Sequence, residues 1–227
     1  NAYRDTLAGR MSANSVARYK NTLNAAFNWY IKENGLEITS PFAGLLIKGA
    51  GSSKVDRLPL QDAHIKLLEP AMKESEIAWA LYVLLRDTGA RVAEIAGLRV
   101  QDCDTDKGCL TITPTPWRRL KNKTSERSVP LSQEAATLLK DLIKGKVAEE
   151  PVFERYAKDR GMDNCSQMLM KRLRTVITDK KLTMHSLRHR MKDQLRNTGC
   201  PEAISMVILG HGSNTVAANY GSGCLAP

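Results

Sequence analysis

The sequence predicts a mainly α-helical protein with a small antiparallel β-sheet, an α+β fold. Two observations support this prediction. Apolar residues recur at helical spacing through most of the 227-residue chain. One short region, CLTITP at 109–114, alternates instead between apolar and polar residues, as a strand does. The expected order is therefore helices, a small sheet and then helices again.

The first helix is predicted over 13–33, where apolar residues fall at helical spacing and Asn34-Gly35 supplies a stop. The stretch KGAGSSKVDRL at 48–58 is small, polar and basic, and we interpret it as an interdomain linker. Because one long helix cannot bury a core alone, residues 1–47 are expected to be the remnant of a truncated domain. Residues 59–227 then form the second domain.

In the second domain, Gly108 marks a turn before the strand at 109–114, and Pro130 closes another short strand in ERSVPLS. Ser132 is expected to cap the helix that follows, since its hydroxyl can accept a hydrogen bond from a free first-turn amide. Helices are predicted at about 61–73 and 76–87, from near Arg91, and at 133–144, 164–178, 185–198 and 201–209.

The charge balance favours a polyanionic partner. Lys and Arg number 34 against 24 Asp and Glu, a net charge of +10, and such an excess suits nucleic acid because each neutralised phosphate releases a counterion. No apolar run has membrane-spanning length, and no signal peptide is visible. The five cysteines have no metal-binding spacing, so reduced thiols in a cytoplasmic protein are expected.

Four stretches carry residues suited to chemistry on a phosphate. DTGARVAEIAGL places Arg91 at a helix start, where a cation is unfavourable unless an anion lies nearby. RRLKNKTSERSVP puts lysines at the turn between two strands, and HSLRHRMKDQL places His185 and Arg188 three residues apart in a helix. LGHGSNTVAANYGSG contributes His211 and Tyr220. Each stretch alone is common on protein surfaces.

Together these residues make a metal-free phosphoryl-transfer site. Arginines and histidines can stabilise charge on the non-bridging oxygens in the transition state. A tyrosine can attack the phosphorus and form a covalent ester, and a lysine can give a proton to the leaving oxygen. The chain has no acidic cluster placed for magnesium and no Walker loop, so no cofactor is expected.

The ordered series TGARVAEIAGL, a hairpin lysine before SVPL, HSLRH, LGH and a final Tyr resembles the tyrosine recombinases of the phage integrase type. The resemblance spans about 58–221 and implies the catalytic-domain fold of that family. Residues 12–47 also resemble the last helices of the family's core-binding domain. The resemblance therefore implies a core-binding remnant over 1–47, a linker over 48–58 and a catalytic domain over 59–227.

The resemblance implies a role for each residue of the series. Arg91 and Arg188 would clamp the scissile phosphate, while His185 and His211 would bond it or assist proton transfer. Tyr220 would be the nucleophile that forms a 3′-phosphotyrosyl link. The lysine is expected to be Lys121, with Lys123 as the alternative. Contacts to DNA are expected from flanking basic residues, namely Arg118, Arg119, Arg127 and Arg190.

The implied function is site-specific recombination of double-stranded DNA at attachment sites, for integration or excision of a phage or mobile element. The implied assembly is a homotetramer on DNA, with a monomer expected when the protein is free. Glu94 matches a family glutamate that is expected to be structural. Two alternatives stay open: strand breaking and rejoining of the type IB topoisomerase kind, and DNA binding without catalysis.

Overall fold

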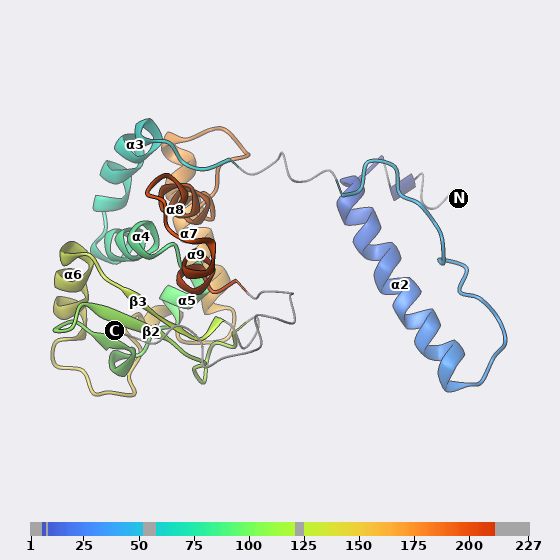
Figure 1. Ribbon diagram of the computed structural model, residues 1–227, viewed down its shortest axis with the longest axis horizontal. Coiled ribbons are helices and arrows are strands. Elements are labelled where there is room, and N and C mark those ends of the chain that lie inside the picture. Colours follow the sequence, from blue (N-terminus) through green and yellow to red (C-terminus); the bar gives the residue numbers. More distant parts are fainter. Residues whose placement is uncertain (1–5, 8, 52–57, 121–124, 212–227) are drawn as a thin grey trace. The chain divides into compact units, whose positions relative to one another are not determined.

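The computed structural model describes residues 6–7, 9–51, 58–120 and 125–211, and the chain divides into two compact units, Asn1–Arg57 and Leu58–Pro227 (Figure 1). The smaller unit holds one long helix, α2 (Ala13–Glu33), as the sequence predicts. Ser12 caps it by accepting a hydrogen bond from the Ser15 amide at 3.2 Å. Several large apolar side chains of α2 stay exposed, Trp29 at 66% and Tyr30 at 55%.

The larger unit is built around α4 (Glu76–Thr88), whose residues 80–85 are all buried. A helix that is apolar on every side belongs in a core, and α4 contacts helices on several sides. Its neighbours are α3 (Asp62–Lys73), α5 (Val92–Ala96), α6 (Gln133–Ile143) and α8 (Ser186–Asn197). α7 (Gly161–Val176) packs on α3 and α5, and α9 (Glu202–Leu209) packs on α8 and β3.

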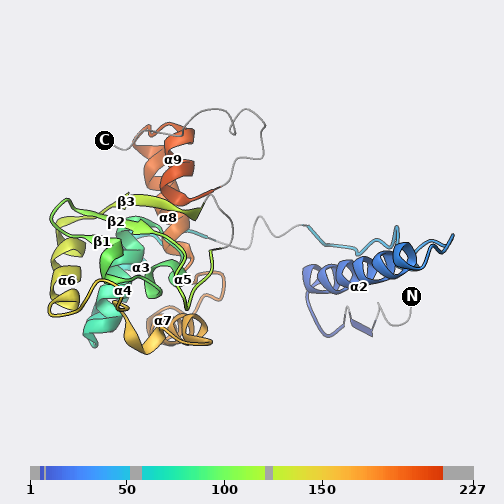
Figure 2. The same cartoon turned by 90° about the horizontal axis from the view of Figure 1, so that it is seen from below.

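The sheet has three antiparallel strands in the order β1 (Cys103–Asp104), β2 (Cys109–Ile112) and β3 (Arg127–Pro130). Figure 2 shows the strands in one layer, with α9 on one side and α4 on the other. Leu110 pairs with Val129, and Ile112 pairs with Arg127. Because side chains alternate along a strand, these four residues share the face that is buried. A charged residue therefore occupies the core face of the sheet.

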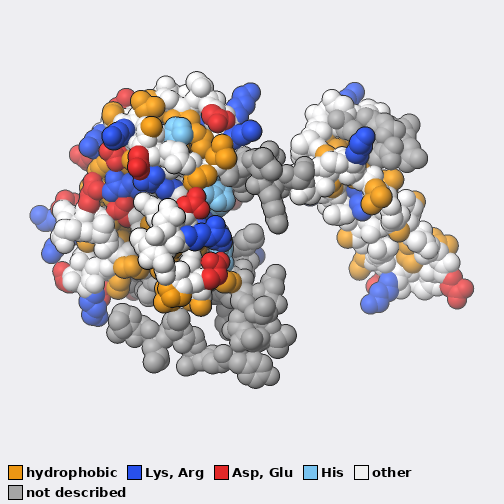
Figure 3. All heavy atoms as spheres, turned by 45° about the horizontal axis from the view of Figure 1, so that its top comes forward, with side chains coloured by type: hydrophobic (Ala, Val, Ile, Leu, Met, Phe, Trp, Pro, Cys, Tyr) orange, Lys and Arg blue, Asp and Glu red, His pale blue; other side chains and the backbone are white. Residues whose placement is uncertain are grey.

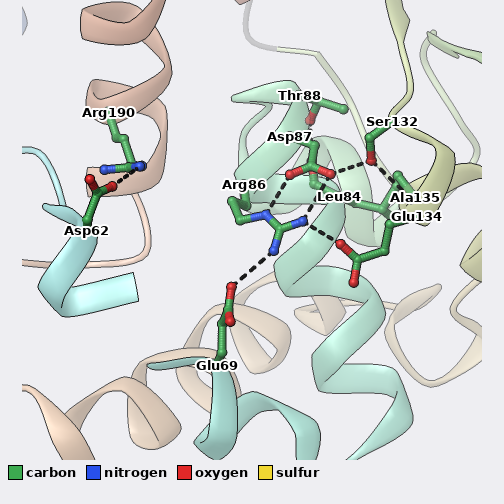
Figure 4. A network of polar contacts seen from close by, with 10 residues as sticks. All are labelled: Asp62, Glu69, Leu84, Arg86, Asp87, Thr88, Ser132, Glu134, Ala135 and Arg190. Carbon is green, nitrogen blue, oxygen red and sulfur yellow. Dashed lines mark hydrogen bonds and ion pairs between the residues drawn. The ribbon is translucent and has the colours of Figure 1, made fainter. Parts of the chain in front are cut away.

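A polar network fastens α4 to α3 and α6 (Figure 4). The Arg86 guanidinium donates to Asp87 at 2.6 Å, to Glu134 at 2.6 Å and to Glu69 at 3.2 Å. The hydroxyl of Ser132, the cap of α6, donates to the second Asp87 oxygen at 2.5 Å. Burial alone would lower the pKa of Arg86, but the bonds to Asp87 and Glu134 raise it. The network fixes α4 just before the turn that leads to the candidate site.

The predicted α+β class and the predicted order of helices, sheet and helices are confirmed. The structure adds pieces too short for a periodic pattern, namely β1 and the 3₁₀ turns Val100–Asp102 and Glu154–Tyr156. α7 begins at Gly161 rather than 164. A Cβ at Gly161 would lie 2.0 Å from the Tyr156 carbonyl oxygen, so the helix starts where only glycine fits.

Candidate active site

The turn after α4 brings three helices together at one glycine. Gly89 has a left-handed backbone, with φ of 61°, and its amide donates to the Leu85 carbonyl. A Cβ at this position would lie 2.7 Å from Met191 Cγ and 2.9 Å from Leu209 Cδ2. Glycine is therefore required at position 89 for two reasons. It allows the left-handed turn, and it leaves room for α8 and α9 to pack against the end of α4.

Arg91 directly precedes α5. The sequence predicts an anion near this arginine, and the Glu94 carboxylate is one such anion. The Glu94 carboxylate accepts from the Arg91 amide at 2.8 Å and from the Arg91 guanidinium at 2.6 Å. Burial would raise the pKa of Glu94, but its bonds to Arg127 and Arg91 lower it, so the carboxylate is charged at neutral pH. The Arg91 side chain is 24% exposed, which leaves part of it accessible to a ligand.

Arg188 is a buried cation whose bonds are to backbone carbonyls. Its guanidinium donates to the Gly89 carbonyl at 2.8 Å and to the Leu209 carbonyl. The side chain thus joins α8 to the ends of α4 and α9. Burial, together with the charges of Arg91 and Arg127, lowers the pKa of Arg188 to about 10. Positive charge is therefore concentrated here beyond what Glu94 neutralises.

His185 directly precedes α8, and Leu187 is buried in the core. The His185 ring meets the His189 ring edge to face, with centroids 5.1 Å apart. His185 is half-buried, so its imidazole retains contact with the surface. The histidine of the HxxR stretch therefore lies at the N-terminus of the helix that carries Arg188.

His211 lies just past α9. Gly210 takes the left-handed conformation, with φ of 60°, and the His211 amide donates to the Met206 carbonyl at 2.9 Å. Burial, followed by the nearby charges of Arg188, Lys192 and Arg91, lowers the pKa of His211 to about 4. With this pKa the imidazole is neutral at neutral pH, so it can donate a hydrogen bond through its ring N–H to a bound anion.

We call Arg91, Arg127 and Arg188 the cation cluster, and the neutral imidazole of His211 lies in its electrostatic field. Two of the cluster's guanidiniums, those of Arg91 and Arg127, bond to the Glu94 carboxylate, and the third, that of Arg188, bonds to backbone carbonyls. The arrangement favours the binding of an anion, because like charges held together in a partly desolvated place gain from a counter-charge. Lys121, Lys123 and Tyr220, the other predicted members of the site, lie outside the described residues.

The four arginines expected to contact DNA differ in placement. Arg119 is exposed, and Arg190 donates to the Leu60 carbonyl at 3.1 Å and to Asp62 at 2.5 Å. Arg118 and Arg127 are only 4% and 7% exposed. Arg118 packs on Gly97, whose added Cβ would lie 2.6 Å from its Nε. For Arg118 and Arg127 this placement favours an internal role over the predicted contact to DNA.

Sequence reasoning missed the bonding of Arg127. Its guanidinium donates to Glu94 at 2.9 Å, to the Ile208 carbonyl at 2.7 Å and to the Ser125 carbonyl at 2.8 Å. One signal could have found it: Arg127 and the apolar Val129 are two apart in a strand, so they share a face. The expectation that Glu94 is structural agrees with its bonds to Arg91 and Arg127.

The surface of the larger unit carries charges of both signs. On the face drawn in Figure 3, Lys and Arg lie among Asp and Glu, and histidine side chains reach the surface. Among the described residues, no group of three His, Cys, Asp or Glu is placed to hold a metal ion. In the same part of the chain, no helix is both long enough and apolar enough to cross a membrane.

The chain is similar to several recombinases. The tyrosine recombinase XerA of Pyrococcus furiosus is 25% identical over 158 residues, which cover 68% of this chain and 53% of the relative. XerC of Thermodesulfovibrio yellowstonii is 27% identical over 92% of this chain and 71% of its own length. The chain spans about half the length of the first curated relatives it matches, 53% and 43%.

Solved structures share the fold. A lambda integrase tetramer bound to a Holliday junction matches with a TM-score of 0.70 and 18% identity, over 95% of this chain and 63% of that chain. The Tn1549 transposon integrase in complex with a circular intermediate DNA matches with a TM-score of 0.67 and 20% identity, over 95% of this chain and 77% of that chain. The model of the phage integrase family matches residues 58–222. This chain belongs to the phage integrase family.

Proposed function

We propose that this chain cleaves and rejoins DNA strands at specific sites through a covalent 3′-phosphotyrosyl intermediate. The observation that carries the proposal is the excess of guanidinium over carboxylate in the cation cluster. A DNA phosphodiester supplies the missing anion, and its negative charge grows on the non-bridging oxygens as the phosphorus is attacked. The relatives named above are tyrosine recombinases and integrases, which agrees with this chemistry.

The proposed cleavage step uses this chain's own residues. The Tyr220 hydroxyl oxygen attacks the phosphorus, a P–O bond to the tyrosine forms, and the bond from phosphorus to the 5′ oxygen breaks. The leaving 5′ oxygen takes a proton from Lys121, with Lys123 as the alternative. The phenolic proton passes to the imidazole of His185 or His211, and the negative charge of the bound phosphate favours that transfer. Rejoining reverses each transfer with another 5′ hydroxyl. Because the phosphotyrosyl ester conserves the energy of the broken phosphodiester bond, the reaction needs no cofactor.

Arg91 and Arg188 would hold the non-bridging oxygens. Arg91 is the partly exposed member, so it can reach an incoming phosphate directly. Arg188 is fixed by two backbone carbonyls, which holds its planar guanidinium in one orientation. A fixed donor needs little rearrangement when charge develops, which is the condition for transition-state stabilisation.

The test is covalent capture in a buffer that contains EDTA and no nucleotide. The protein is incubated with a pool of nicked duplexes of randomised sequence, and adducts are separated on a denaturing gel. We expect an adduct from the wild type and none from Tyr220→Phe. Tyr30→Phe is the matched control, because Tyr30 is an exposed tyrosine of α2, and it should form the adduct normally. A Tyr220→Phe adduct equal to wild type would reject the proposal.

The same capture separates the alternatives. Site-specific recombination requires that captured duplexes share a sequence and that two cut duplexes exchange strands. Relaxation of supercoiled plasmid without a shared sequence would indicate topoisomerase-like activity. Binding without any adduct would indicate a non-catalytic DNA-binding protein. Captured sequences that match the ends of a phage or mobile element would support integration or excision, whereas a single chromosomal site would point to a chromosomal role.

The proposed assembly is a homotetramer on double-stranded DNA, with a free monomer, in the cytoplasm of a bacterial or phage-infected host cell. A lambda integrase tetramer on a Holliday junction is among the structures with this fold. Sedimentation of the free chain should give a monomer, and addition of captured duplex should give larger species. A stable tetramer without DNA would contradict this assembly.

A further inference from the structure

Arg118 is a buried arginine whose guanidinium bonds to none of the described residues. It is 4% exposed, and none of its three side-chain nitrogens has a hydrogen-bond partner in the described part of the chain. The other two buried arginines, Arg127 and Arg188, are both bonded. A guanidinium stays protonated even when it is buried, and an unpaired buried charge destabilises a folded protein. Arg118 is therefore a full positive charge that the described residues do not pair.

The backbone and a neighbouring helix hold Arg118 in place. Its amide donates to the Thr115 carbonyl at 3.1 Å, and the Thr115 amide donates to the Arg118 carbonyl at 3.0 Å. Trp117 Nε1 donates to the Gly97 carbonyl at 3.2 Å. A Cβ on Gly97 would lie 2.6 Å from Arg118 Nε. Since Gly97 directly follows α5, the Arg118 side chain lies across the end of the helix that carries Glu94.

The two carboxylates nearest in charge to Arg118 already have partners. Both oxygens of Glu94 accept hydrogen bonds from members of the cation cluster. Both oxygens of Asp102 accept from Arg99. Burial lowers the pKa of Arg118, and the charges of Glu94 and Asp102 raise it. The positive charges of Arg99 and Arg127 lower it further, so Arg118 and the cation cluster act on each other electrostatically.

We propose that Arg118 strengthens phosphate binding at the cation cluster through its charge, without touching the phosphate. The buried guanidinium makes the potential around the cluster more positive, because charges in a poorly solvated place are weakly screened. A phosphate held by Arg91 and Arg188 gains from that potential, and it gains more as negative charge grows in the transition state. The inference rests on the proposed function.

The proposal predicts that one substitution raises stability and lowers activity. Arg118→Met keeps an unbranched side chain and removes the charge, so the Tm of the full chain should rise by at least about 2 °C. Arg99→Met is the contrasting variant, because it leaves the buried Asp102 carboxylate without its ion pair, and it should lower the Tm. Thermal unfolding followed by circular dichroism measures both.

A neutral phosphate analogue separates an electrostatic role from a structural one. In a methylphosphonate duplex, a methyl group replaces one non-bridging oxygen at the cleaved position, so the substrate and the transition state each carry one negative charge fewer. The experiment measures single-turnover adduct formation on ordinary and methylphosphonate duplexes at limiting protein concentration. A purely structural defect slows both equally, because the folded fraction cancels from the ratio of the two rates.

Arg118→Met should slow adduct formation about 10-fold on ordinary DNA, less than the roughly 10²–10³-fold cost of removing a direct donor. The loss on the methylphosphonate duplex should be only about threefold, because about half as much negative charge interacts with the guanidinium in the transition state. Lys140→Met is the control for net charge, since Lys140 is a 70% exposed lysine of α6. It should leave the Tm and both rates unchanged.

Two results would overturn the role of Arg118 and leave the proposed function intact, provided that the wild type is active. The first is a lower Tm for Arg118→Met, which would mean that the guanidinium has a partner. The second is an equal loss on the two duplexes, or no loss on either. A wild type that forms no adduct with ordinary DNA would overturn the proposed function, and the role of Arg118 with it.

Discussion

Two arginine networks of the larger unit have opposite charge balances. Around Arg86, one guanidinium meets three carboxylates, those of Glu69, Asp87 and Glu134 (Figure 4). In the cation cluster, the guanidiniums of Arg91 and Arg127 share one carboxylate, Glu94, and the guanidinium of Arg188 bonds to backbone carbonyls. The first network neutralises the Arg86 guanidinium and holds α4 against α3 and α6. The second holds cations that the described residues leave under-neutralised, as an anion-binding site requires.

The two networks lie near each other in the chain, since α4 ends two residues after Arg86 and Gly89 follows. Their chemistry differs because their partners differ. Arg86 bonds to side chains, whereas Arg188 bonds to backbone carbonyls, which carry no net charge. Arginine bonded to neutral acceptors keeps its charge available to a ligand. The comparison predicts that matched changes in the two networks affect different properties.

The largest effect should separate Arg188 from Arg86. Arg188→Lys keeps a positive charge but loses the planar fork that donates to two carbonyls, so the rate of adduct formation should fall by about 10²–10³-fold. Arg86→Lys should leave that rate within about threefold of wild type, because its bonds serve helix packing. Single-turnover adduct formation on a captured duplex measures both. Similar losses for the two variants would remove the distinction between the networks.

The next effect concerns stability. Glu94→Gln leaves the buried Arg127 without a counter-charge and should cost about 3 kcal/mol, which corresponds to a fall in Tm of about 6–12 °C. Glu134→Gln removes a carboxylate that is 44% exposed, and should cost about 0–1 kcal/mol. Thermal unfolding followed by circular dichroism compares them. A Glu134→Gln protein less stable than Glu94→Gln would contradict the account.

His211 should make stability depend on pH. Its pKa is lowered from 6.5 to about 4 in the folded protein, so the unfolded chain binds more protons between these values. The stabilisation is therefore full above pH 6.5 and lost as the pH falls toward 4. Discounted for partial exposure, the loss is about 1 kcal/mol. Urea unfolding of wild type and His211→Gln from pH 7 to 4 should show the difference, and parallel curves would exclude it.

The smallest effect concerns the surface arginines. Arg119 is exposed, so Arg119→Gln should lower the slope of log binding constant against log salt by about 0.9, the value for one phosphate contact. Arg190 is already paired with Asp62, and Arg190→Gln should change the slope less. Binding to a captured duplex over a range of salt concentrations tests this. An unchanged slope for Arg119→Gln would remove it from the DNA interface.

Much of the fold could be predicted from the sequence because its helices are regular. Ser12 and Ser132 cap the helices that follow them, and the apolar run in α4 is as buried as its composition suggests. The short pieces could not be predicted, since β1 has only two residues. The start of α7 depends on the close approach of Gly161 to the Tyr156 carbonyl. Helical periodicity in the sequence does not report that contact.

The candidate site was only partly predictable. The order of its motifs identified Arg91, His185, Arg188 and His211, and the structure gathers Arg91, Arg188 and His211 within one electrostatic neighbourhood. Arg127 was assigned to DNA because it was considered as a charge and not as a strand residue. The lowered pKa of His211 depends on burial and on charges from other elements, and no local pattern in the sequence carries that information.

The central claim is that Tyr220 becomes covalently joined to DNA phosphate. The most direct measurement is the mass of the trypsin-digested adduct after nuclease treatment. Cleavage after Arg196 leaves a peptide of residues 197–227, which has no Lys or Arg and holds a single tyrosine, Tyr220. The account predicts that this peptide carries the added nucleotide at Tyr220. The nucleotide on any other residue, or an unmodified peptide from a genuine adduct, would contradict it.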